Sequence, residues 1–209
     1  MGSCKSSNNS QRKIKYDNGE YYIGEVKDGL PHGKGTHYYK NGDILYEGDF
    51  VNGFPEGYGK GVYKNGNYYI GQFKNGVKYG KGILYYKNGN TYFEGEFIND
   101  KVEGKGQLFY QNGEYYIGQF KNGLKQGKGI AYYKNGNIEY EGDFMNNKYE
   151  GIGKYINYNG NYYIGEWKNG LMHGKGVYYH KNGNIIYKGN FIKGIDLETY
   201  LELKNKYTG

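Results

Sequence analysis

The residues best suited to chemistry lie at the amino terminus, in the stretch MGSCKSSNNSQRK. Gly2 and Ser6 fit the pattern Met-Gly-x-x-x-Ser/Thr, in which a myristoyl group is added to the glycine amine once Met1 has been removed. Cys4, the single cysteine of the chain, lies where a palmitoyl group can join its thiol. We therefore expect Gly2 to be myristoylated and Cys4 to be palmitoylated; the alternative is a chance match.

Stable membrane attachment needs more than one such signal, because a single myristoyl chain binds a membrane with an association constant of only about 10⁴ M⁻¹. The palmitoyl group on Cys4 is one candidate for the second signal. Basic residues that precede the first acidic residue of the chain are a weaker candidate. They are Lys5, Arg12, Lys13 and Lys15.

A second candidate for chemistry is the glycine-rich stretch around Lys34. A phosphate-binding Walker A loop has the pattern Gly-x-x-x-x-Gly-Lys-Ser/Thr before a helix, because backbone N–H groups hold the phosphates and the hydroxyl binds magnesium. Here Gly29 is one residue too close to Gly33, Gly35 replaces the hydroxyl residue, and the pattern that follows is that of a strand. We therefore expect no nucleotide site.

Histidines give no sign of a metal site. His32 and His37 form one pair and His173 and His180 another, with no second cysteine or acidic cluster at ligand spacing. No nucleophile, base and orienting residue lie together in a recognisable pattern. We expect no metal, no cofactor and no enzymatic activity.

The composition permits an anionic partner without requiring one. The chain has 209 residues, including 39 Gly and 30 Tyr, and a formal net charge of +7. Lysines and aromatic residues together can bind single-stranded nucleic acid, but aromatics at strand spacing are better explained by packing on one another. We expect no nucleic acid as a partner. With no apolar secretion signal or long apolar segment, we expect a cytosolic protein or one on the cytosolic face of a membrane.

Most of the aromatic residues and glycines of the chain belong to an internal repeat. The glycine of each Tyr-x-Gly motif falls at residues 24, 48, 71, 95, 118, 142, 165 and 189, so the spacings alternate between 24 and 23 and the duplicated unit is 47 residues long. Repeated residues are usually part of the architecture. Alternation with period two and the Asn-Gly pairs indicate antiparallel hairpins, with strands near 116–120 and 129–133, a loop at 121–127 and a turn at 134–136.

The predicted fold is all-β: an elongated, twisted, single-layer antiparallel sheet of tandem hairpins, on the order of 75 Å long. Such a layer must be stabilised by a ladder of aromatic side chains on one face. Gly118 and its equivalents lie between two rings, and we expect Gly118→Val to damage the sheet locally. The ladder comprises Tyr22, Tyr46, Phe50, Tyr69, Phe73, Phe93, Phe97, Tyr116, Phe120, Tyr140, Phe144, Tyr163, Trp167, Tyr187 and Phe191.

The pattern Tyr-x-Gly-x-Phe/Trp, Asn-Gly, Gly-x-Gly, Asn-Gly resembles the Membrane Occupation and Recognition Nexus (MORN) repeat, in about eight copies over residues 13–195. Two departures are Asp100 and Asn147, which replace a turn glycine but tolerate positive φ. Residues 1–12 are then a flexible lipid-anchor tail. Residues 196–209 are predicted to form a short capping helix, with Asp196 as its N-cap and Leu197, Tyr200 and Leu201 at helical spacing.

The resemblance implies a non-catalytic scaffold on a cytosolic membrane face, with a role at the cell cortex, that binds a protein partner or a second copy of itself. The alternative implied by the family name is direct binding of anionic phospholipids by the repeats. Lysines that recur at the Gly-x-Gly step, near one edge of the expected sheet, would supply the contacts. They are Lys34, Lys81, Lys105, Lys128 and Lys175, and solvated lysines are the simpler interpretation.

Overall fold

The structure, a computed structural model, describes residues 11–196, with side chains described as far as residue 195. Contacts divide the chain into two compact units, which join between Lys101 and Val102. Within the described residues every regular element is a β-strand. The predicted all-β class, built from consecutive antiparallel hairpins, is confirmed.

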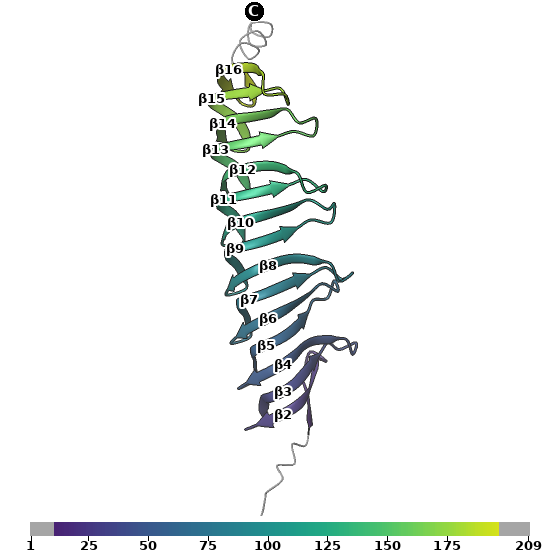
Figure 1. The fold of residues 1–209 in the computed structure, drawn as a ribbon. Helices are drawn as coiled ribbons and strands as arrows, with labels where there is room; N and C mark the ends of the chain where they lie inside the picture. Colours follow the sequence, from purple (N-terminus) through teal and green to yellow (C-terminus); the bar gives the residue numbers. More distant parts are fainter. Residues whose placement is uncertain (1–10, 197–209) are drawn as a thin grey trace, which may run out of the picture. The chain divides into compact units, whose positions relative to one another are not determined.

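Unit 1 contains strands β1 to β8, each paired antiparallel with the next along the chain (Figure 1). The order of strands is therefore the order of the sequence, as short hairpin connections require. The strands are β1 (Arg12–Lys15), β2 (Tyr21–Lys27), β3 (Leu30–Tyr38), β4 (Ile44–Val51), β5 (Phe54–Val62), β6 (Tyr68–Lys74), β7 (Val77–Tyr85) and β8 (Thr91–Ile98).

Unit 2 repeats this arrangement with strands β9 to β17, again paired in chain order. They are β9 (Lys101–Phe109), β10 (Tyr115–Lys121), β11 (Leu124–Tyr132), β12 (Ile138–Met145), β13 (Lys148–Ile156), β14 (Tyr162–Lys168), β15 (Leu171–Tyr179), β16 (Ile185–Ile192) and β17 (Ile195–Asp196). The first strand of each hairpin alternates between 7 residues, as in β10, and 8 residues, as in β12.

The first turn of each copy is shorter than expected. Asn122 and Gly123, with φ of 52° and 82°, form a two-residue turn between β10 and β11, which is the geometry that Asn-Gly favours. The predicted loop over 121–127 is therefore wrong, because β11 already begins at Leu124. Asp100 and Asn147 replace the turn glycine at φ of 67° and 68°, and the positive φ expected there is confirmed.

From the turn at Gly53 onward, these short turns are also bonded to the hairpin before them. The Gly123 N–H donates to the Val102 carbonyl at 2.9 Å, and the Gly170 N–H donates to the Tyr149 carbonyl at 2.9 Å. The Glu150 carboxylate accepts the Asn169 N–H at 2.8 Å. These bonds fix the position of one hairpin against the next without side-chain packing in a second layer.

A row of glycines crosses every full-length strand at its middle, and we call it the glycine row. The pairing register aligns Gly118 with Gly106 on one side and with Gly129 on the other. In unit 1 the row is Gly24, Gly35, Gly48, Gly59, Gly71, Gly82 and Gly95. In unit 2 it is Gly106, Gly118, Gly129, Gly142, Gly153, Gly165, Gly176 and Gly189.

The glycine row exists because tyrosine rings lie across it. A Cβ on Gly118 would overlap the hydroxyl end of Tyr116 and would come within 2.7 Å of the Gly129 Cα. A Cβ on Gly129 would overlap the same ring. Each ring thus occupies the space of two missing side chains, and its burial follows: Tyr22, Tyr69, Tyr116 and Tyr163 are 0% exposed.

Edge-to-face contacts join these tyrosines to the phenylalanines of the ladder. In unit 2 the Tyr116 ring centroid lies 4.8 Å from that of Phe144, and Phe144 lies 5.1 Å from Tyr140. Trp167 continues the series 5.4 Å from Tyr140 and donates its indole N–H to the Gly153 carbonyl at 3.2 Å. The face that carries these rings is called the core face below.

The ladder uses tyrosine because of a backbone irregularity. A shift of register follows Gly118, and the Tyr116 hydroxyl donates to the carbonyl of Gln119 there at 3.1 Å. The same bond runs from Tyr140 to the Asp143 carbonyl at 3.0 Å. Each hydroxyl therefore supplies a hydrogen bond to a carbonyl at the irregularity.

Candidate interaction surface

The face opposite the core face, called the outer face, carries the side chains that flank the glycine row. Residues directly before and after a strand glycine point away from the tyrosines, because successive side chains alternate between the two faces. On one flank the register aligns a series that we call the isoleucine row. In unit 2 it is Gln107, Ile117, Ile130, Glu141, Lys154, Ile164, Val177 and Lys188.

The other flank carries the predicted lysines and is called the lysine row. In unit 2 it consists of Lys105, Gln119, Lys128, Asp143, Ile152, Glu166, Lys175 and Asn190. The expectation that these lysines lie near one edge of the sheet is wrong. Because β11 begins at Leu124, Lys128 falls at the middle of the strand, beside the glycine row.

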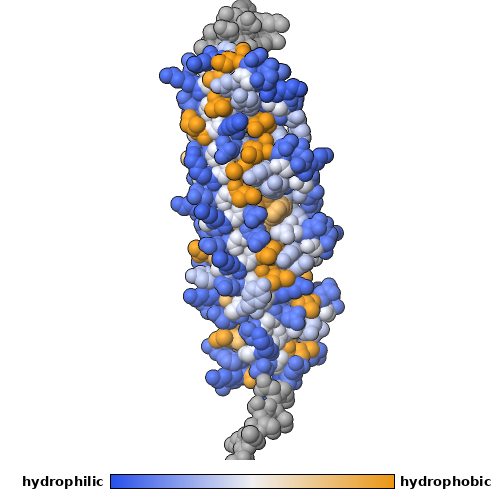
Figure 2. Space-filling model, viewed as in Figure 1, coloured by the Kyte–Doolittle hydropathy of each residue, from blue (hydrophilic) through white to orange (hydrophobic). Residues whose placement is uncertain are grey.

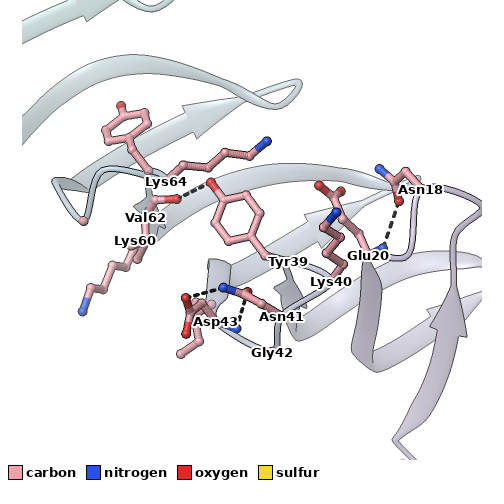
Figure 3. A pocket seen from close by; sticks show the side chains of 13 residues that line it. Asn18, Glu20, Tyr39, Lys40, Asn41, Gly42, Asp43, Lys60, Val62 and Lys64 are labelled. Atoms are coloured by element: carbon pink, nitrogen blue, oxygen red, sulfur yellow. Dashed lines mark hydrogen bonds between the residues drawn. The ribbon is translucent and has the colours of Figure 1, made fainter.

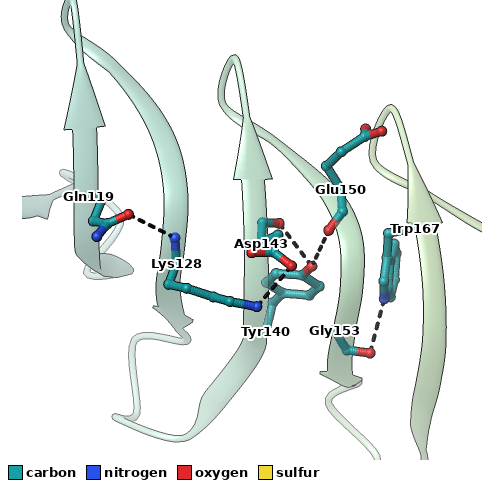
Figure 4. A network of polar contacts seen from close by, with 7 residues as sticks. All are labelled: Gln119, Lys128, Tyr140, Asp143, Glu150, Gly153 and Trp167. Carbon is teal, nitrogen blue, oxygen red and sulfur yellow. Dashed lines mark hydrogen bonds and ion pairs between the residues drawn. The ribbon is translucent and has the colours of Figure 1, made fainter.

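Ion pairs occupy part of the lysine row. The Lys34 ammonium group lies 2.8 Å from an Asp49 carboxylate oxygen, and Lys128 lies 2.9 Å from Asp143 (Figure 4). Lys81 faces Glu96 across the strands, whereas Lys105 and Lys175 face Gln119 and Asn190. Acidic side chains therefore interrupt the lysines, and the row does not form a uniformly basic strip.

Between the two rows of unit 2 the outer face is hollowed along the glycine row. This groove has a volume of about 600 Å³ and is lined by Ile117, Ile130, Ile152 and Ile164 together with Lys128, Glu141 and Lys154. Ile117, Ile152 and Ile164 are 39%, 58% and 41% exposed. Figure 2 shows separate apolar patches among hydrophilic side chains on the visible surface. Exposed apolar side chains in register along a groove are typical of an interaction surface.

A second cleft lies in unit 1 beside the Asn-Gly turns (Figure 3). Its volume is about 950 Å³, and its lining includes Glu20, Tyr39, Asp43, Lys60 and Lys64. The Tyr39 hydroxyl donates to the Val62 carbonyl at 2.8 Å, and the Asn41 amide donates to Asp43 at 2.8 Å. The Tyr39 hydroxyl and the Asn41 amide are therefore both bonded to groups that line the same cleft.

The core face holds two lysines that sequence reasoning missed. Lys78 and Lys125 occupy equivalent positions 47 residues apart, and Lys125 Nζ lies 5.1 Å from the ring centroid of Tyr116 and 3.2 Å from the Tyr110 hydroxyl. Burial lowers the pKa of Lys125. For Lys78 burial also acts to lower the pKa, but bonds to Tyr63 and Asp100 raise it overall. The only signal in the sequence was their exact repeat spacing.

A further titratable group, Glu139, lies near Lys125. Burial raises the pKa of the Glu139 carboxyl, against a hydrogen bond with Tyr149 that favours the carboxylate. The Tyr149 ring stacks on Tyr140 with centroids 3.8 Å apart, and burial raises the pKa of Tyr149. These two groups therefore lie within the aromatic packing of the core face.

The predicted membrane-facing residues divide between described and undescribed parts of the chain. Gly2, Cys4 and Lys5 lie outside the described residues. Arg12, Lys13 and Lys15 lie on β1, and Lys13 Nζ is 4.1 Å from the ring centroid of Tyr21. Asp196, expected to cap a helix, lies in β17 and pairs with Phe191, while the rest of that predicted helix lies outside the described residues.

Two features are absent from residues 11–196. No helix there is both long and apolar enough to cross a membrane. In the same range no group of three or more His, Cys, Asp or Glu side chains could hold a metal ion.

A tandem array of antiparallel hairpins with an aromatic core face and a glycine row defines a β-hairpin repeat protein. The MORN repeat matches seven times, at residues 22–44, 46–68, 69–91, 93–115, 116–138, 140–162 and 163–185. The chain therefore belongs to the MORN-repeat family, as its sequence predicted. The eighth copy, which begins at Tyr187, contributes β16 and β17 within the described residues and lies beyond the matched residues.

Other comparisons add little. No curated protein matches the chain. A crystal structure of a protein of unknown function from Bacteroides caccae is 11% identical over 88% of this chain and 82% of that chain, with a TM-score of 0.21. This likeness is too distant to inform either fold or function.

Proposed function

We propose that this protein is a non-catalytic MORN-repeat scaffold, held at the cytosolic face of a membrane by acyl groups on Gly2 and Cys4. Its outer face would bind a protein partner or a second copy of the chain. The observation that carries the scaffold role is the groove of unit 2, where isoleucines remain exposed in register along the strands. A buried core face needs no such residues on the opposite side.

The membrane attachment is carried by the amino-terminal pattern. Myristate on Gly2 alone gives marginal binding, so palmitate on Cys4 would make the attachment stable. Lys13 packs on Tyr21 and Arg12 and Lys15 lie beside it on β1, so three basic residues enter the sheet next to the acylated segment. This basic cluster would add electrostatic attraction to an anionic leaflet.

Metabolic labelling with an alkyne analogue of myristate, followed by membrane fractionation, tests the attachment. We expect label on the wild-type chain and membrane association that weakens in Cys4→Ser and is lost in Gly2→Ala. Lys121→Ala, a change at an exposed residue at the end of β10, is the matched control and should fractionate as wild type. Absence of label on the wild-type chain would contradict the proposal.

Direct phospholipid binding by the repeats is the alternative, and the interrupted lysine row argues against it. Asp49 and Asp143 neutralise two of the five predicted lysines through close ion pairs. Cosedimentation of the Gly2→Ala variant with vesicles containing phosphoinositides distinguishes attachment through the acyl groups from lipid binding by the repeats. We expect no pelleting; pelleting that is released by salt and reduced in Lys105→Ala and Lys175→Ala would show that the repeats bind lipid themselves.

A further inference from the structure

The outer face of unit 2 has a palindromic pattern across its strands. From β10 to β15 the isoleucine row carries Ile117, Ile130, Glu141, Lys154, Ile164 and Val177. The first two and the last two members are apolar, and the central two are of opposite charge. Reversing the order of the strands therefore keeps apolar positions apolar and exchanges the acid with the base.

The neighbouring outer row has the same symmetry. Next to the isoleucine row, on the side away from the glycine row, β10 to β15 carry Tyr115, Tyr132, Ile138, Ile156, Tyr162 and Tyr179. The tyrosines stack in pairs, with centroids of Tyr115 and Tyr132 at 4.4 Å and of Tyr162 and Tyr179 at 4.6 Å. Reversal places tyrosine on tyrosine and isoleucine on isoleucine.

We propose that unit 2 pairs with unit 2 of a second copy, outer face against outer face, about a two-fold axis that runs parallel to the strands between β12 and β13. This proposal rests on the proposed scaffold role and names one of its partners. The axis reverses the order of the strands but keeps each row opposite itself. Glu141 then faces Lys154 of the second copy, Ile130 faces Ile164, and Ile117 faces Val177.

Charge disfavours a second two-fold arrangement that also brings these faces together. An axis along the isoleucine row would keep the strand order and would place Glu141 on Glu141 and Lys154 on Lys154, and like charges in contact are unfavourable. In the proposed arrangement the lysine row also places Lys128 opposite Glu166. Asp143 opposite Ile152 is the one mismatched pair, and Asp143 is already paired with Lys128 in its own chain at 2.9 Å.

The available area is adequate for a specific dimer. Eight strands at about 4.8 Å spacing and three rows of side chains give a patch of about 38 Å by about 20 Å, on the order of 700 Å² per copy. A standard interface buries roughly 800 Å² per partner, and aligned sheets pack face to face about 10 Å apart. Unit 1 has the same central charges, Glu47 and Lys60, but Thr36 replaces one apolar member, so unit 2 is the better surface.

Sedimentation equilibrium of the unacylated Gly2→Ala chain tests this pairing independently of the membrane. We expect twice the 24.0 kDa chain mass for the parent protein. Glu141→Lys and Lys154→Glu should each weaken the dimer at least tenfold, because each places like charges in contact, and the double exchange should restore affinity to within roughly threefold. Glu47→Lys, the same change at the equivalent position of unit 1, is the matched control and should leave the dimer intact.

Three results would overturn the pairing. One is a monomer at about 100 µM, a concentration at which even weak specific dimers form. Another is a double variant that dimerises no more tightly than the single variants, although thermal unfolding shows that all of them are folded. The third is a Glu47→Lys variant that dissociates while Glu141→Lys does not, which would assign the contact to unit 1. Loss of membrane association with an intact dimer would overturn only the anchoring part of the proposed function.

Discussion

The Lys78 ammonium group lies 3.0 Å from the Asp100 carboxylate, whereas Lys125, at the same position 47 residues later, lies near Asn147 and has no carboxylate at that distance. Both lysines extend over tyrosine rings, so both are removed from water. The two copies thus hold the same cation beside a carboxylate in one turn, Asp100, and beside an amide in the other, Asn147. Glu139 also acts electrostatically on Lys125, so the contribution of the turn carboxylate is best measured by exchanging Asp100 and Asn147.

Asn147→Asp should stabilise unit 2 by about 0.5–1 kcal/mol at neutral pH, because it gives Lys125 the partner that Lys78 has. The backbone tolerates the change, since Asp100 has φ of 67° and Asn147 has φ of 68°. The ion pair needs a deprotonated carboxyl, so the gain should be present at neutral pH and be lost in acid, where the carboxyl is protonated. Chemical denaturation at pH 7 and at about pH 3 measures this. Asp100→Asn is the reciprocal control, and equal stability of both variants with the parent would contradict the interpretation.

Tyr116→Phe should destabilise unit 2 by about 1–2 kcal/mol, because it removes the hydroxyl that bonds to the Gln119 carbonyl and leaves this group buried without that bond. The ring itself fits, since Phe93 is the native residue at the same ladder position of another copy, where it is 1% exposed. Fluorescence of Trp167, the single tryptophan, reports the unfolding of unit 2. Tyr132→Phe, the same deletion on the outer face, should change stability by less than about 0.5 kcal/mol.

Gly71→Ala should destabilise unit 1 by about 3 kcal/mol, because the new Cβ would overlap the end of the Tyr69 ring and would come within 2.6 Å of the Gly82 Cα. Gly61→Ala is the matched control. Its Cβ would meet only the Phe73 ring, at 3.3 Å or more, and the equivalent positions in later copies carry Leu108 and Tyr155. Thermal unfolding should place Gly61→Ala within about 1 kcal/mol of the parent. A similar loss in both variants would show that the glycine row is not required for the ring packing.

The fold should lose stability above pH 10. Burial raises the pKa of Tyr22, Tyr116 and Tyr163 to about 12 from an ordinary value of 10.0. The unfolded chain therefore releases tyrosine protons that the folded chain retains, and between pH 10 and about 12 each such tyrosine costs up to about 1.4 kcal/mol per pH unit. Denaturant midpoints at about pH 9, 10 and 11, with tyrosinate absorbance as a second probe, measure this. A midpoint that does not fall across this range would contradict the burial of these hydroxyls.

The sequence was sufficient to predict the hairpins and the order of the strands, because both follow from local signals: Asn-Gly turns, alternation and a 47-residue period. It was insufficient for the exact turn position. A first turn at 121–127 would start β11 at residue 129, whereas β11 starts at Leu124. Lys128 would then lie at the end of the strand, whereas it lies in the middle. The lysine row was consequently expected in the wrong place.

Cross-strand relationships were the other limit. The glycine row, the contact between Lys125 and Tyr116 and the palindromic order around Glu141 all depend on the pairing register. Irregularities such as the one after Gly118 shift that register, and the size of the shift cannot be read from the local sequence. The tyrosine hydroxyl bonds depend on the same irregularities. The sequence therefore shows that Tyr is commoner than Phe at these positions, but it does not show the reason.

The alternation of 7-residue and 8-residue first strands constrains how such a chain can change its length. Neighbouring hairpins differ in strand length, and on the outer face apolar pairs such as Ile117 and Ile130 alternate with charged pairs such as Glu141 and Lys154. Removing one hairpin would bring two like pairs together and abolish the reversal symmetry. Recombination that inserts or deletes whole two-hairpin blocks preserves both patterns, so viable length variants of this protein should differ by multiples of 47 residues.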